Sequence, residues 1–246
     1  MSREVPMLTR ALPLLRVLAV VLALAVVVLL VAVGVSMVTG GTPDTPQTEA
    51  ERSLMAAEQA VRANPEDATA RVKLAAAYMS EKRYSDAIDQ ARTAQRLSPD
   101  DPSAPYILGL AQAAGGDTPA ALQSLQQATS LQGQVAQFYQ DAFVALSHVQ
   151  EKLGDTDAAI DSMNKAVDHG PENALLLYER GTLFERTGNW SYALQDYLWA
   201  LEYVPDYEPA VAAFTALSTA HPEALDEVRS WQDQGTQEAT STASGT

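Results

Sequence analysis

Residues 154–171, GDTDAAIDSMNKAVDHGP, and residues 188–205, GNWSYALQDYLWALEYVP, align residue for residue at a separation of 34. Both stretches begin with Gly, carry Ala at the sixth and thirteenth residues, and end with Pro. Sliding the chain by 34 residues extends the alignment to four blocks, at 68–101, 102–135, 140–173 and 174–207, with residues 136–139 inserted after the second. A repeat of this length is typical of solenoids, in which one small unit is stacked several times.

Small residues recur at three positions of every block, counted from its first residue. Position 20 is Ala87, Ala121, Ala159 and Ala193, position 27 is Ala94, Ala128, Ala166 and Ala200, and position 8 is Ala75, Gly109, Ser147 and Gly181. Each block also holds two stretches of apolar periodicity, which predict two helices. Small side chains at fixed positions let paired helices approach closely, so we expect the blocks to be helix hairpins.

Turn residues mark the breaks between these helices. Positions 15 and 16 are Gly116-Asp117, Gly154-Asp155 and Gly188-Asn189 in the last three blocks, and Lys82-Arg83 in the first. Gly adopts the left-handed conformation that ends a helix, and Asp or Asn starts the next helix. Pro recurs at position 32 of three blocks and predicts the turn between blocks, because it cannot continue a helix. We expect Asp100-Asp101 in such a turn to cap a helix rather than bind Ca²⁺.

This pattern of small, apolar and Pro positions resembles the tetratricopeptide repeat (TPR) family. The resemblance implies an all-α fold, a right-handed TPR superhelix of about four repeats over residues 67–207. The chain departs from the family at position 4, where an aromatic residue is usual and Arg71, Pro105, Phe143 and Leu177 stand here. Arg180 is a second departure, because the other three blocks have Leu at position 7.

Partial caps are expected on both sides of the array, because the terminal repeats of a solenoid bury one face only. Residues 49–66 predict an N-terminal capping helix, and residues 208–231 predict two C-terminal capping helices. Residues 39–48 form a Thr-, Pro- and Gly-containing linker. Residues 232–246 show no apolar periodicity, and we expect a disordered tail there.

Residues 17–38, VLAVVLALAVVVLLVAVGVSMV, contain no charged side chain. As a helix, these 22 residues span about 33 Å, which matches a bilayer core of about 30 Å, so we expect one transmembrane helix in contact with lipid. Three arginines precede it and no Lys or Arg follows until Arg52, so the positive-inside rule places residues 1–16 in the cytoplasm and the repeats outside the cell membrane. The alternative is a cleaved signal peptide, whose apolar core is usually shorter, about 7–15 residues.

The composition excludes several classes of site. The chain has 16 Lys and Arg against 31 Asp and Glu, and its net charge of −15 argues against nucleic-acid binding. It contains no Cys, which excludes thiolate metal sites and cysteine nucleophiles. The sequence has no phosphate-binding glycine loop, no Gly-x-Ser-x-Gly motif and no paired histidines at metal-ligand spacing. We therefore expect a non-catalytic protein that needs no metal and no cofactor.

The resemblance implies a concave groove lined by positions 2, 5, 9 and 12 of the first helix in each pair. The residues of this predicted groove are Val72, Ala76, Met79, Tyr106, Leu110, Val144, His148, Glu151, Tyr178, Thr182 and Glu185. Its first half is apolar and suits an apolar helix or extended peptide, and its second half adds acidic groups that favour a basic ligand. The Lys and Asn with which some TPR proteins bind C-terminal carboxylates are absent from positions 5 and 9.

Two points about these surfaces stay open. Val72, Leu110 and Val144 either face the groove or lie partly buried between adjacent first helices. Trp190 and Tyr192 belong to an aromatic-rich last block and are either covered by the closing helices or exposed to a partner.

We expect a scaffold that binds a protein or peptide partner, another membrane protein included, outside the membrane. Residues 63–67, ANPED, resemble the stretch before the first repeat of membrane-anchored TPR proteins in cytochrome c maturation, which implies an envelope assembly or chaperone factor. A structural subunit of a larger membrane or surface complex is the other alternative.

Overall fold

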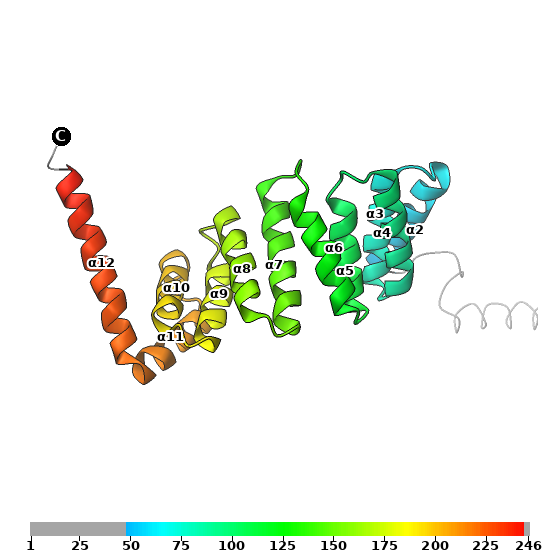
Figure 1. The fold of residues 1–246 in the computed structure, drawn as a ribbon. Helices are drawn as coiled ribbons and strands as arrows, with labels where there is room; N and C mark the ends of the chain where they lie inside the picture. The colour runs from blue at the N-terminus through cyan, green and yellow to red at the C-terminus, as the bar shows by residue number, and fades with distance from the viewer. Residues whose placement is uncertain (1–47, 244–246) are drawn as a thin grey trace, which may run out of the picture. The chain divides into compact units, whose positions relative to one another are not determined.

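The structure, a computed structural model, describes residues 48–243, and Ser53 begins the second of the two units into which the chain divides. The fold described here is essentially that of the second unit. Residues 48–243 form eleven helices and no strand, drawn in Figure 1. The helices are α2 (Glu49–Ala63), α3 (Ala68–Ser80), α4 (Tyr84–Leu97), α5 (Ser103–Ala114), α6 (Thr118–Ser130), α7 (Ala136–Lys152), α8 (Thr156–His169), α9 (Ala174–Arg186), α10 (Trp190–Tyr203), α11 (Glu208–Ala220) and α12 (Pro222–Ala243).

Four consecutive helix pairs form the body of the second unit. α3 packs against α4, α5 against α6, α7 against α8, and α9 against α10, and the second helix of each pair also packs against the first helix of the next. Figure 1 shows the pairs stacked in a row from α3 to α10. The predicted all-α solenoid of four repeats is therefore confirmed.

Small residues make the close contacts between these helices. The alanines at positions 20 and 27 of all four repeats are completely buried, at 0% exposure. Position 8 lies against position 24 of the same repeat: a Cβ atom on Gly109 would lie 2.6 Å from Leu125 Cγ, and one on Gly181 would lie 2.6 Å from Tyr197 Cε1. Glycine is needed at both places because the side chain that faces it is large and buried.

The predicted turns adopt left-handed backbone conformations. Gly116, Gly154 and Gly188 have φ angles of 93°, 84° and 76°. Lys82, at the equivalent position of the first repeat, has a φ of 58°. A side chain raises the free energy of this conformation, so the first repeat forms the same turn with a less suitable residue.

Acidic residues cap several helices as expected. Asp67, Asp117 and Asp155 accept hydrogen bonds from backbone N–H groups at the starts of α3, α6 and α8. Asp101 Oδ1 accepts a hydrogen bond of 2.9 Å from the Ser103 N–H in the turn before α5, but the N-cap of this helix is Pro102 and no side chain caps it. Asn189 differs from the prediction, because its Nδ2 donates to Thr187 Oγ1 and its side chain does not cap α10.

The insertion at residues 136–139 lengthens α7 at its start, since this helix begins at Ala136. Four residues are close to one helical turn of 3.6, so the later residues of α7 keep the faces that the repeat requires. Ala159 and Ala193 beyond the insertion are as completely buried as Ala87 and Ala121 before it.

The N-terminal capping helix is only partly equivalent to a repeat helix. On α2, Ala57 packs with Leu74 and Ala77 of α3, but Ala60, which aligns with position 27, is exposed. A cavity of about 460 Å³ lies between α2 and α3 and explains this difference, since the two helices do not close tightly.

The C-terminal end departs from the repeat. α11 begins at Glu208, 34 residues after the start of α9, but α12 packs against α10 as well as α11 and buries Ala224 and Val228 there. α12 continues to Ala243, into the stretch from residue 232 where a disordered tail is expected. Residues 232–243 contain no Pro, and extending an existing helix costs less than starting one.

The predicted transmembrane segment at residues 17–38 lies outside the described residues. Of the helices between residues 48 and 243, none combines the length and apolar character needed to cross a bilayer.

Candidate peptide-binding surfaces

The predicted groove residues lie on the first helices of the four repeats. Val72, Ala76 and Met79 are on α3, Tyr106 and Leu110 on α5, Val144, His148 and Glu151 on α7, and Tyr178, Thr182 and Glu185 on α9. At 3.6 residues per turn, positions 2, 5, 9 and 12 fall within about 80° of one helix face. Nine of these residues are half-buried, while His148 and Glu185 are exposed.

Two ion pairs connect α7 and α9 along this row. His148 Nε2 lies 3.4 Å from Glu179 Oε2, and Arg186 Nη1 donates to Glu151 Oε1. The hydrogen bond to Glu179 raises the pKa of His148 above its usual value, and partial burial opposes this rise. Apart from this pairing, the buried Glu179 Oε2 has no hydrogen-bond partner among the described residues. The acidic half of the groove is therefore held by pairs that link the third and fourth repeats.

Two groove tyrosines take part in packing between helices. The ring of Tyr106 meets Phe138 of α7 edge to face at a centroid distance of 5.2 Å. Tyr178 packs against Tyr197 at 5.8 Å and against Tyr207 at 5.7 Å. Burial raises the pKa of Tyr106, as expected for a hydroxyl removed from water. Both tyrosines are thus partly structural.

The apolar groove residues divide into packed and free side chains. Val144 packs against the core formed by the third and fourth repeats, and Met79 packs against that of the first two. Val72 and Leu110 belong to none of the core clusters in the described part of the chain, and both are half-buried. Together with the smaller Ala76, which also belongs to none of these clusters, Val72 and Leu110 are therefore the apolar side chains of the groove that a ligand can contact most directly.

A second hollow surface lies between α9, α10 and α12. It has a volume of about 1,050 Å³, and aromatic side chains from the three helices line it: Phe184, Tyr192, Trp199 and Trp231. Tyr192 contacts both Phe184 and Trp231 at centroid distances of 5.4 Å. We call this cavity the aromatic pocket.

Trp190 and Tyr192 are each partly covered and partly exposed, so both of the alternatives considered for them hold in part. The Trp190 ring stacks on His221, with centroids 3.4 Å apart, and remains 36% exposed. Tyr192 is 56% exposed and lines the open aromatic pocket. The closing helix α12 covers part of this surface and forms one wall of the pocket.

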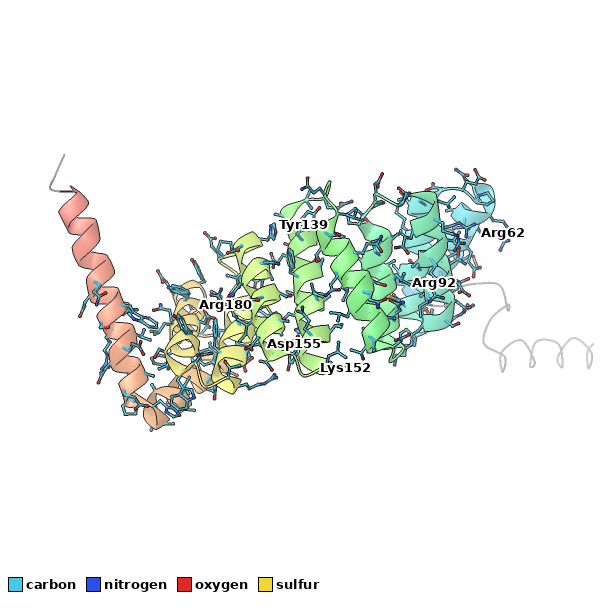
Figure 2. All side chains as sticks on the ribbon, in the orientation of Figure 1. Arg62, Arg92, Tyr139, Lys152, Asp155 and Arg180 are labelled. Carbon is cyan, nitrogen blue, oxygen red and sulfur yellow. The ribbon has the colours of Figure 1, made fainter. Side chains whose placement is uncertain are left out.

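Arg180, the departure at position 7, lies at the aromatic pocket, and Figure 2 labels its side chain. Its Nε and Nη2 atoms donate to the two carboxylate oxygens of Asp196 at 2.8 and 2.6 Å, and its Nη1 donates to Asn164 Oδ1 at 3.1 Å. The Arg180 and Asp196 side chains are only 12% and 2% exposed. Burial raises the pKa of the Asp196 carboxyl, and the hydrogen bonds from Arg180 offset part of that rise.

Sequence reasoning identified Arg180 but missed Asp196. Position 23 is polar in every repeat, as Gln90, Ser124, Ser162 and Asp196, and in the second repeat Ser124 Oγ donates to buried Gln112 at 2.7 Å. Arg at position 7 together with Asp at position 23 occurs in the last repeat alone. The appearance of these two opposite charges in the same repeat is the sequence feature from which a buried ion pair could have been predicted.

The aromatic pocket and the predicted groove occupy different faces of α9. Arg180 and Phe184 are at positions 7 and 11 of their repeat, which at 3.6 residues per turn lie roughly opposite positions 2, 5, 9 and 12. Neither surface resembles a metal centre, because the described residues contain no group of three His, Asp or Glu side chains that could hold an ion.

MamA, YrrB and TTC0263 are among the solved structures that share this fold. The MamA protein is 26% identical, covers 65% of this chain and 87% of its own, and has a TM-score of 0.55. YrrB, a TPR protein with an unusual peptide-binding site, is 24% identical, with coverages of 67% and 83% and a TM-score of 0.54. TTC0263, a thermophilic TPR protein of Thermus thermophilus, is 21% identical, with coverages of 68% and 90% and a TM-score of 0.53.

No curated protein matches the sequence. The model of the tetratricopeptide repeat family matches residues 47–102, 90–136 and 144–206, which together make up more than half of the chain. With its helix pairs and buried alanines in the register of the repeat, the chain belongs to the tetratricopeptide repeat family.

Proposed function

We propose that this chain is a membrane-anchored TPR scaffold that binds a peptide or protein partner outside the cytoplasmic membrane. TPR proteins bind peptide or protein partners and are generally non-catalytic. The observation that carries the binding role is the row of groove residues, which stay half-buried or exposed on the first helices of all four repeats. YrrB, whose likeness supports the fold, is described as having a peptide-binding site.

The chemistry of the row suggests how a partner lies in it. Val72 and Leu110 offer apolar contacts at the α3–α5 end. Exposed Glu185 adds negative charge at the α7–α9 end, where Glu151 is already paired with Arg186. We therefore expect an extended or helical segment that places apolar residues on α5 and basic residues on α9.

The anchor rests on the uncharged stretch at residues 17–38 and on the arginines before it. Holding both partners at one bilayer raises their effective concentration, so a groove of modest affinity is sufficient. This proposal has the repeats outside the cytoplasm and residues 1–16 inside.

A photo-crosslinking amino acid at Leu110 tests the groove in native membranes. The matched control places the same group at Asp89, an exposed residue on α4, the second helix of its pair. We expect a discrete adduct from position 110 alone, and we expect Leu110→Glu to weaken partner binding without lowering the melting temperature. Equal adducts from both positions would contradict the groove assignment.

The absence of Cys from the chain allows a clean test of topology. Single variants Ser2→Cys and Thr42→Cys are treated with a membrane-impermeant maleimide in intact cells. We expect Thr42→Cys to react in intact cells and Ser2→Cys to react only after lysis. Labelling of Ser2→Cys in intact cells would refute the proposed orientation, and recovery of the chain in the soluble fraction would refute the anchor.

A further inference from the structure

We propose that the aromatic pocket is a second binding site, separate from the groove, that takes an arginine or lysine side chain of an extended peptide on a partner protein. This inference goes beyond the scaffold role, because it places recognition on the opposite face of α9. It rests on the size, the aromatic walls and the charge balance of the pocket.

The size of the pocket suits a peptide segment. Its volume of about 1,050 Å³ lies just above the range of about 300–1,000 Å³ typical of small-molecule sites. Trp199 is 42% exposed and Tyr192 is 56% exposed, so their rings stay accessible from solvent. A monomeric protein rarely leaves several aromatic rings exposed together unless they form an interaction site.

The charges around the pocket favour a cation. Arg180 is already neutralised by the two hydrogen bonds to Asp196. Glu202, which also lines the pocket, is exposed and forms no ion pair with any described residue. Because Arg180 balances Asp196, Glu202 leaves the lining with an excess of one negative charge.

Glu202 stands beside the rings that would hold the cation. It follows Trp199 by three residues on α10, so both side chains lie on one face of this helix. A guanidinium or ammonium group over an aromatic ring gains cation–π attraction, and the guanidinium plane can also stack on the ring. The carboxylate of Glu202 would neutralise the same group. An anionic side chain would instead meet Glu202 and Asp196 with no free positive charge.

The floor of the pocket can hold the backbone of a peptide. Arg180 has five N–H groups, of which three donate to Asp196 and Asn164, leaving two. These can donate to carbonyl groups, the acceptors of an extended segment. The pocket therefore combines a site for a basic side chain with donors for the main chain beside it.

The test uses the full chain in detergent and two synthetic peptides. The arginine peptide is Ac-Gly-Ser-Ala-Leu-Arg-Leu-Ala-Ser-Gly-NH2, and the second has citrulline, which is isosteric and uncharged, in place of arginine. Two of the three tryptophans, Trp199 and Trp231, line the pocket, so tryptophan emission reports binding directly. We expect a saturable change with the arginine peptide and at least about ten-fold weaker binding of the citrulline peptide. Equal affinities, or no saturable change up to millimolar peptide, would overturn the proposal.

Two variants that each remove one negative charge show whether binding depends on the charge in the pocket or on the net charge of the protein. Glu202→Gln removes the proposed counter-charge, while Glu172→Gln removes one charge from an exposed turn outside the pocket. We expect about ten-fold weaker binding of the arginine peptide to Glu202→Gln and unchanged binding to Glu172→Gln, with equal melting temperatures. A groove variant, Leu110→Glu, should bind the arginine peptide as well as the wild type does. Loss of binding in Leu110→Glu, or equal loss in both glutamine variants, would refute the site at the pocket and leave the groove proposal standing.

Discussion

Replacing Arg180 with leucine tests how much the buried ion pair contributes to the fourth repeat. The change restores the Leu that the other three repeats carry at position 7, so it is compatible with the helical backbone at this position. It removes hydrogen bonds of 2.8 and 2.6 Å and leaves the Asp196 side chain, only 2% exposed, without its partner. Breaking a buried pair in this way costs about 3–5 kcal/mol. Leucine buries more apolar surface and offsets part of this loss, so we expect destabilisation of about 3 kcal/mol at pH 7.

The second and third repeats supply the matched control. Arg180→Leu combined with Asp196→Ser gives the fourth repeat the Leu and Ser of Leu108 with Ser124 and of Leu146 with Ser162. Replacing a buried pair as a whole is often neutral, so we expect the double variant to lie within about 1 kcal/mol of the wild type. The difference of about 2 kcal/mol or more between the single and the double variant would measure the cost of leaving Asp196 buried without its partner.

The stability deficit of the single variant should depend on pH. Burial raises the pKa of Asp196 and Arg180 opposes the rise, so removing Arg180 raises this pKa further. A carboxyl whose pKa is higher in the folded state than in the unfolded state destabilises the fold at neutral pH, and this effect disappears as the pH falls and the group is protonated. The deficit relative to wild type should therefore shrink in acid.

The assay is urea unfolding followed by tryptophan fluorescence. All three tryptophans lie on α10 and α12, so the signal reports the fourth repeat and its cap even where a repeat array does not unfold as one unit. If Arg180→Leu is as stable as the wild type, or the double variant is as unstable as the single one, the assigned role of the pair is refuted.

Three further predictions concern the turns, the helix contacts and the groove. Lys82→Gly should stabilise the first repeat by about 0.5–1 kcal/mol in urea unfolding followed by circular dichroism, which reports all the helices, because the backbone at residue 82 has a φ of 58°; a loss of stability would contradict this. Gly109→Ala should destabilise by about 1 kcal/mol despite its better helix propensity, because the new Cβ meets Leu125 Cγ at 2.6 Å, and a stabilised variant would show that α5 and α6 separate easily. In an NMR titration, the pKa of His148 in the folded protein should lie above its usual value of 6.5. The stabilising pairing with Glu179 should be lost as the pH rises through this raised pKa. Glu179→Gln should lower the pKa of His148, and an unchanged pKa would exclude the pairing.

Much of the fold could be predicted because its contacts repeat. Alanine at position 20 of each repeat meets the same neighbouring helix, so one spacing of 34 predicts four buried sites together. The direction in which α12 runs could not be predicted from the repeat spacing. His221 alone separates α11 from α12, a shorter turn than those inside the repeats, and α12 then packs on α10. That packing depends on the tertiary arrangement of three helices and not on any local pattern.

The two candidate surfaces show the same contrast. Leu110 and its equivalents could be placed on one face because they occupy the same repeat position. Trp199 and Trp231 line one pocket only because α12 returns to α10, which the spacing of 32 residues between them does not reveal. The burial of Asp196 was also hidden, since an acidic residue on a helix usually faces solvent.

The extra turn at the start of α7 shows where this architecture tolerates growth. Four residues rotate a helix by about 400°, so a chain that gains a full turn before Ala136 keeps the packed side of α7 unchanged. Two residues would rotate it by about 200° and turn the packed side to water. Length variants at this point should therefore survive in steps of whole turns, which makes it the natural position for inserting a tag or a reporter into the array.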